Sequence, residues 1–103
     1  MIHLTTDETG APQAPEGKFP LGHTVATPGA IATVPKDEMQ AALFRHHHGD
    51  WGDVCQNDRL ENERSLHDGS RLLSVFHTKA GTKFYIITEH DRSVTTVLLP
   101  EEY

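Results

Sequence analysis

Three consecutive histidines, His46 to His48, followed by Asp50, are the first residues of this sequence whose types suggest chemistry. Neutral imidazoles and a carboxylate are suitable ligands for zinc, nickel or copper. Adjacent helical residues point about 100° apart, so three in a row cannot converge on one ion while the helix persists. Protonated histidines near a helix C-terminus also interact favourably with its dipole. We therefore predict no native metal site and keep His46, His48 and Asp50 as the candidate ligands.

A second constellation lies in the second half of the chain: Arg71, His77, Lys83, Tyr85, Glu89, His90 and Arg92, with Tyr103 last. A metal-free ribonuclease needs a base for the 2'-hydroxyl, an acid for the leaving oxygen, and cations for the phosphorane charge. The side chains that can supply these roles are His77, Lys83, Glu89, His90 and Arg92. The solvent face of any small sheet carries the same residue types, so catalysis is the alternative hypothesis.

Trp51 stands between two turn residues, Asp50 and Gly52. Tryptophan is enriched in binding hot spots, which makes Trp51 a candidate anchor for a protein partner. Such a residue also often fills the gap where two helices meet and then belongs to the core. Both interpretations stay open at this point.

The segment from Asp50 to Asp68 is acidic. Six acidic residues stand there against two arginines: Asp50, Asp53, Asp58, Glu61, Glu63 and Asp68 against Arg59 and Arg64. Such a surface repels phosphate, so we do not expect direct nucleic-acid binding through it. It can meet a basic protein, with Asp58 and Glu61 as candidate contacts, or it is a solvated face.

Helical signals predict helices over 28–33, 35–48 and 54–67. Thr27 and Asp53 are suitable N-caps for the first and third helices, and a glycine follows each of the last two. The apolar spacing of the second helix is formed by Met39, Ala42, Leu43, Phe44 and His46.

The rest of the chain reads as strands. β-branched and aromatic residues fill 71–78, 83–90 and 94–100, with turn residues between them, which predicts an antiparallel meander; 19–27 is a candidate edge strand. One sheet face would carry Leu73, Val75, Phe84, Ile86, Val94 and Leu98, and the other Leu72, Phe76, Tyr85, Ile87, Val97 and Leu99. A slip of one residue would exchange the faces of a strand.

The length of 103 residues suits one small domain, and the net charge is -6. Residues 1–18 are poor in large apolar groups, so we predict a disordered tail followed by one α+β domain over 19–103. In it, two helices pack on one face of a three- or four-stranded antiparallel sheet. No segment is apolar enough to span a bilayer, and the single cysteine, Cys55, agrees with a reducing compartment, so we expect a cytoplasmic protein.

Several motifs resemble a group of short bacterial proteins found on plasmids and integrated mobile elements. These motifs are His48–Asp53, Asp58-Arg59 with Asn62, Asp68–Ser74 and Ile87–Tyr103, and the resemblance covers about residues 20–103. Some members are described as a subunit of a type I restriction system, which would imply a methyltransferase. This chain has no Gly-rich cofactor loop after a first strand and is too short for a Rossmann-like domain. The resemblance therefore implies a mobile-element setting and a small α+β domain.

No phosphate-binding loop, Ser-His-Asp order or dinucleotide fingerprint is present, so we predict no cofactor. We expect a non-enzymatic accessory protein of a mobile element that works through contacts with another protein. The alternative is a small ribonuclease similar to toxins of the RelE type, which also place helices before a small antiparallel sheet.

Overall fold

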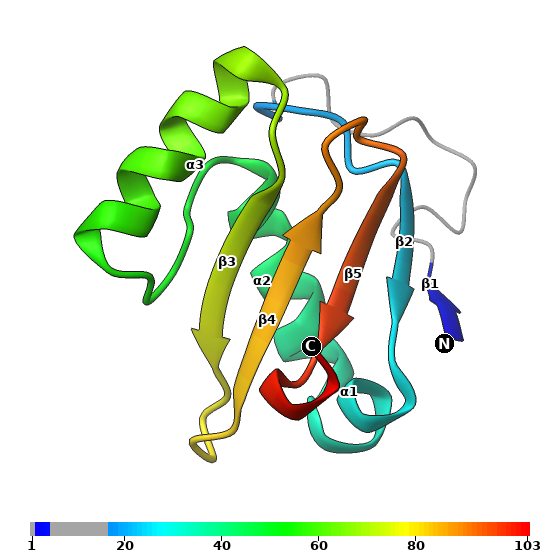
Figure 1. The fold of residues 1–103 in the computed structure, drawn as a ribbon. Helices are drawn as coiled ribbons and strands as arrows, with labels where there is room; N and C mark the ends of the chain where they lie inside the picture. The colour runs from blue at the N-terminus through cyan, green and yellow to red at the C-terminus, as the bar shows by residue number, and fades with distance from the viewer. Residues whose placement is uncertain (1, 5–16) are drawn as a thin grey trace.

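The computed structural model describes residues 2–4 and 17–103, which form a mixed sheet, three helices and a short turn (Figure 1). The elements are, in chain order, β1 (Ile2–Leu4), β2 (His23–Ala26), α1 (Pro28–Thr33), α2 (Lys36–His47), α3 (Gln56–Asp68), β3 (Leu72–His77), β4 (Lys83–Thr88), β5 (Val94–Leu98) and the 3₁₀ turn η1 (Pro100–Glu102). None of the helices described is long and apolar enough to cross a bilayer.

The strands are ordered β1-β2-β5-β4-β3. The meander β3–β4–β5 is antiparallel, as the sequence predicts, and the α+β class is confirmed. The expectation of a wholly antiparallel sheet is wrong at one pair, because β2 runs parallel to β5, with Thr24 beside Thr95. Parallel neighbours require a long connection, which the helices and the meander supply here. Strand β1 is antiparallel to β2 on the outer side of the sheet.

Helix α2 packs on one face of this sheet, and the short helix α1 adds Ala30 to the same core. The core between them and the sheet consists of Ala26, Ala30, Val34, Met39, Ala42, Leu43, Phe76, Phe84, Ile86, Val97 and Leu99. The predicted grouping of Leu73, Val75, Val94 and Leu98 with Phe84 and Ile86 is wrong, because Ile86 lies opposite Val97 and Tyr85 lies opposite Leu98. Phe76 lies opposite Phe84 in the ladder, so Phe84 and Ile86 share a face with the even-numbered residues of β3. A one-residue shift between neighbouring strands has this effect, and apolar patterns this short do not fix it.

Helix α2 buries residues at intervals of three or four, among them Met39, Leu43 and His46. Phe44 was grouped with them by its apolar character but is 64% exposed, because it is one position, about 100°, from Leu43. Gly49 follows the helix with φ +83°, in agreement with the predicted left-handed stop.

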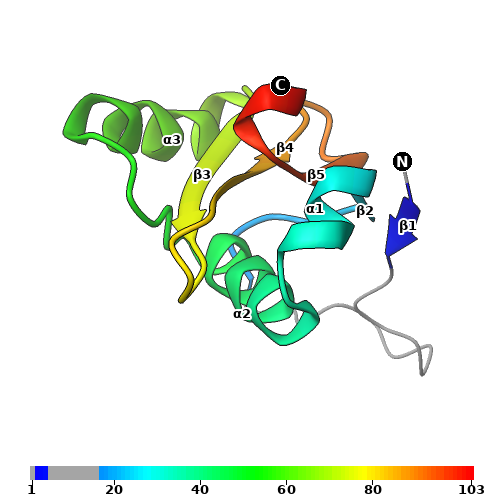
Figure 2. The same ribbon diagram turned by 90° about the horizontal axis from the view of Figure 1, so that it is seen from below.

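Helix α3 lies beside β3, on the opposite side of the sheet from α2 (Figure 2). Gly69 ends it in the left-handed conformation, as predicted. The predicted N-cap, Asp53, is wrong: Cys55 occupies that position and its side chain makes no capping hydrogen bond. The carboxylate of Asp53 is instead 2.8 Å from Nδ1 of His77.

The outer edge of β3 is covered. The Asn62 side chain donates to the carbonyl of Leu73 at 2.7 Å and accepts from its N–H at 3.1 Å. Two residues further along, Val75 donates to the carbonyl of Trp51 and accepts from the N–H of Asp53. These bonds satisfy edge groups that would otherwise be open to another strand.

Most of the predicted disordered tail, residues 1 and 5–16, lies outside the described residues. Within the same stretch, Ile2–Leu4 form β1, and Lys18 donates its N–H to the carbonyl of His47 at 2.8 Å.

Candidate functional site

His46 is fully buried between α2 and the sheet. Its Nδ1 lies 2.6 Å from the hydroxyl of Ser74, and its Nε2 lies 2.8 Å from the hydroxyl of Thr88. Burial, with smaller effects from His47 and Arg92, lowers the pKa of His46 to about 3. The imidazole is therefore neutral at physiological pH.

The hydrogen bonds around His46 have one consistent direction. Thr95 gives its single hydroxyl proton to the carbonyl of Leu21, so Thr88 must donate to Thr95. Because the proton of Thr88 is then used, Nε2 of His46 carries a proton and donates to Thr88. In the neutral ring Nδ1 has none, so Ser74 donates to it. The buried polar groups thus form one satisfied chain across three strands.

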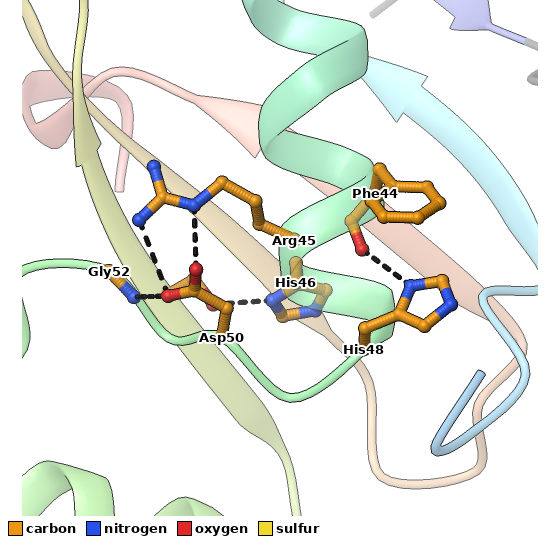
Figure 3. Close-up of polar contacts among 7 residues, drawn as sticks. Phe44, Arg45, His46, His48, Asp50 and Gly52 are labelled. Carbon is orange, nitrogen blue, oxygen red and sulfur yellow. Dashed lines mark hydrogen bonds and ion pairs between the residues drawn. The ribbon is translucent and has the colours of Figure 1, made fainter. Parts of the chain in front are cut away.

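The metal candidates do not converge. Nδ1–H of His48 donates to the carbonyl of Phe44 at 2.9 Å, whereas His46 faces the sheet (Figure 3). Asp50 binds the guanidinium of Arg45 at 2.7 Å, and this hydrogen bond holds the pKa of the Asp50 carboxyl below its usual range. Across residues 2–4 and 17–103, no three His, Cys, Asp or Glu side chains are grouped to hold a metal ion.

The residues proposed for a ribonuclease are spread along the sheet. His77 lies opposite Lys83 at the start of β4, whereas Glu89, His90 and Arg92 follow the end of that strand. At about 3.3 Å per residue, Lys83 and Glu89 are about 20 Å apart along the backbone. The structure therefore does not bring the five residues to one phosphodiester.

The side chain of Arg92 makes hydrogen bonds to backbone carbonyl groups. Its guanidinium donates to the carbonyls of Ser65 at 2.8 Å, Ser70 at 2.6 Å and Glu89 at 3.1 Å. Desolvation by burial lowers its pKa, although an arginine keeps its charge. Arg92 thus connects the β4–β5 turn to the C-terminal end of α3.

Trp51 is buried, with 2% of its surface exposed. The indole N–H donates to Glu63 at 2.8 Å, and the ring stacks on Phe19 with centroids 6.1 Å apart. The partner-anchor interpretation is wrong, because the side chain fills the space between α2, α3 and the sheet edge. The core interpretation is the correct one.

The two acidic candidates, Asp58 and Glu61, are exposed on α3. Near them Leu60 leaves 49% of its surface in solvent. A shallow groove of about 350 Å³ runs along this helix, lined by Leu60, Glu63, Arg64 and His67. The groove thus combines one exposed apolar side chain with charged side chains of both signs, and a surface of this kind can bind a protein.

Two tyrosines with a cation at each end lie side by side near β4 and the C-terminal turn. The guanidinium of Arg71 lies 5.5 Å from the ring centroid of Tyr103, which meets Tyr85 edge to face at 5.9 Å. The ammonium group of Lys83 lies 5.8 Å from the Tyr85 ring. We call these four side chains the cation–tyrosine row.

The hydrogen bonds of Glu102 were not predicted from the sequence. Its carboxylate accepts hydrogen bonds from the hydroxyl of Thr27 and from the N–H groups of Gly29, at 3.1 Å, and Leu99, at 2.9 Å. These bonds, the one from Thr27 above all, lower its pKa. The signal was present, since a glutamate three residues after a helix start often returns to the cap. Its reach to a second helix, 73 residues away in sequence, had no local signal.

No protein-family model, curated protein or solved structure matches this chain. The function of the protein is therefore inferred from its surfaces.

Proposed function

We propose that this protein is a non-enzymatic accessory protein of a mobile genetic element that acts in the cytoplasm by binding a basic protein partner through α3. The observation that supports this most directly is the exposed Leu60 in its groove, on a helix that also exposes Asp58 and Glu61. The net negative charge of α3 attracts a basic partner from a distance, and Leu60 supplies apolar area on contact.

The charge of α3 is not cancelled within the helix. Four carboxylates, Asp58, Glu61, Glu63 and Asp68, accompany Arg59 and Arg64. The Glu61–Arg64 ion pair at 2.8 Å is solvent-exposed on both sides, so it is weak and free to exchange partners. A partner carrying lysines or arginines around an apolar side chain would complement this surface.

The decisive experiment compares matched baits. The chain and a Leu60→Asp/Glu61→Lys variant are used to capture proteins from a bacterial lysate, and the candidate partner is then purified and titrated. We expect a stoichiometric partner with a basic surface whose affinity falls more than tenfold in the variant and decreases with salt. Asp37→Lys, a charge change of comparable kind on α2, is the control and should bind normally.

Two outcomes would contradict the proposal. One is equal binding by the Leu60→Asp/Glu61→Lys variant, and the other is the absence of any stoichiometric partner at mild salt.

The ribonuclease hypothesis loses support from the separation of its residues. Its test is expression in a host cell while growth and RNA integrity are followed. We expect no growth arrest, and therefore no difference between the chain and its His77→Ala or His90→Ala variants. RNA cleavage abolished by either substitution in a folded protein would restore this alternative.

A further inference from the structure

We infer that the cation–tyrosine row binds a short single strand of nucleic acid, with a base stacking on Tyr103 and phosphates pairing with Arg71 and Lys83. This site is separate from α3, so it goes beyond the proposed protein contact. The inference departs from the expectation that direct nucleic-acid binding is unlikely, which was based on the acidic segment 50–68. The row comes instead from β4, from Arg71 just before β3 and from the C-terminal turn.

The order of the side chains determines the kind of ligand. A cation stands at each end, and two aromatic rings stand between them, with successive links of 5.5 to 5.9 Å. One phosphate cannot contact both cations across two rings. A single strand, in contrast, repeats phosphates and bases along its length, so it can occupy the whole row.

Three members of the row are accessible. Tyr103 is 64% exposed, and Arg71 and Lys83 are exposed as well, whereas Tyr85 is half-buried. Every base has a π-face, so stacking on a tyrosine does not depend on the base sequence. A duplex hides its base faces, which makes it a poorer ligand for this row.

Of the two glutamates in the C-terminal turn, Glu101 is exposed and Glu102 makes hydrogen bonds within the protein. The carboxylate of Glu102 accepts hydrogen bonds from Thr27, Gly29 and Leu99, and the first two of these residues lie at the start of α1. Because the whole chain carries a net charge of -6, the interaction must be local and sensitive to salt.

The test measures fluorescence anisotropy of a labelled ten-nucleotide uridine strand with the full chain. Two phosphate contacts on a single strand predict a slope of about -1.4 for log K against log salt concentration. Lys83→Ala should reduce this slope to about -0.7, since one contact is removed. Lys36→Ala, which removes an exposed lysine at the start of α2, should leave the slope unchanged.

Two substitutions of Tyr103 test the contribution of its ring to binding. Tyr103→Ala should weaken binding by roughly 5- to 100-fold, the effect of losing one stacked base. Tyr103→Phe retains the ring and removes only the hydroxyl that accepts a hydrogen bond from Arg71, so it should weaken binding less than Tyr103→Ala. Tyr103 is largely exposed, so both variants are expected to fold, and circular dichroism checks this.

Competition separates the possible ligands. Uridine monophosphate and a ten-base-pair RNA duplex should compete at least tenfold less well than the unlabelled strand. Equal competition by the monophosphate, equal loss in Lys36→Ala and Lys83→Ala, or no binding at 50 mM salt would each overturn the inference. None of these outcomes bears on the α3 contact, whose test uses different variants.

Discussion

The side-chain amide of Asn62 makes the two hydrogen bonds to Leu73 that a neighbouring β-strand would otherwise make. A residue of helix α3 therefore completes the ladder at the outer edge of β3. Asn62 is 4% exposed, so water cannot easily replace its amide as the hydrogen-bond partner of Leu73.

Replacing Asn62 with aspartate should destabilise the fold. The carboxylate still accepts from the N–H of Leu73, but it places an acceptor against the carbonyl and buries a charge. We expect a loss of about 1–3 kcal/mol in urea unfolding, followed by the fluorescence of Trp51. Asn57→Asp on the exposed part of the same helix is the matched control and should change stability little. Equal stability of Asn62→Asp and the parent would show that the amide does not support this edge.

The second prediction concerns Gly52, which forms a parallel bridge with Val75. Its φ is +72°, and a Cβ there would lie 2.1 Å from the carbonyl oxygen of Val75. Gly52→Ala must therefore displace the backbone from β3, at a cost of about 2–3 kcal/mol. Gly81→Ala separates the strain of a positive φ from the steric clash with Val75. Gly81 also has a positive φ, but an added Cβ there would have nothing within 4 Å. Thermal unfolding should show a clearly smaller effect for Gly81→Ala, and similar losses would exclude the steric explanation.

The third prediction is a pH dependence from His46. The pKa of His46 is about 3 in the folded protein and about 6.5 in the unfolded chain. Below pH 6.5 His46 therefore binds a proton in the unfolded chain but not in the folded protein. This contribution to stability is complete above the unfolded pKa and decreases as pH falls towards 3. Between pH 7.5 and pH 5 we expect a loss of about 2 kcal/mol in the free energy of unfolding.

His46→Gln is the control for the third prediction, since an amide keeps a donor and an acceptor without titrating. The variant should be less stable at pH 7.5 but should show a flatter profile between pH 7.5 and pH 5. A profile as steep as that of the parent would assign the dependence to other groups.

The fourth prediction concerns metal binding. His46 is enclosed by Ser74 and Thr88, and the Asp50 carboxylate is bound to Arg45. We expect calorimetry with zinc to detect no tight binding that depends on these side chains. The parent and a His48→Ala/Asp50→Asn variant should give the same isotherm. Tight binding that disappears in this variant would contradict the geometry.

Local patterns predicted much of the fold. Helix boundaries followed from proline and glycine, and the meander followed from alternating β-branched residues. The burial of His46 also had a signal, because it continues the spacing of Met39 and Leu43. The parallel pairing of β2 with β5 had none, since their residues are about 70 positions apart and no neighbouring residue reports the contact.

The candidate sites were harder to predict than the elements. Residue types identified Arg92 as a catalytic cation, but its three backbone partners come from α3, the following turn and the end of β4. Trp51 and Asp53 were assigned by their neighbours in sequence, whereas their contacts with Glu63 and His77 depend on how α3 and β3 pack. Arg71, Tyr85 and Tyr103 were grouped with the sheet by residue type, and only the register brought them together with Lys83.

The directional chain of hydrogen bonds through His46 has a consequence for the lifetime of the folded protein. It joins residues 42 positions apart at Thr88, and Thr95 reaches a carbonyl 74 positions away. Such bonds close after the local elements have formed, so they contribute to the barrier against unfolding more than to the rate of folding. Thr88→Val should therefore raise the unfolding rate while the refolding rate stays nearly constant. The neutral imidazole between α2 and the sheet would then determine how long a molecule stays folded rather than how quickly it folds.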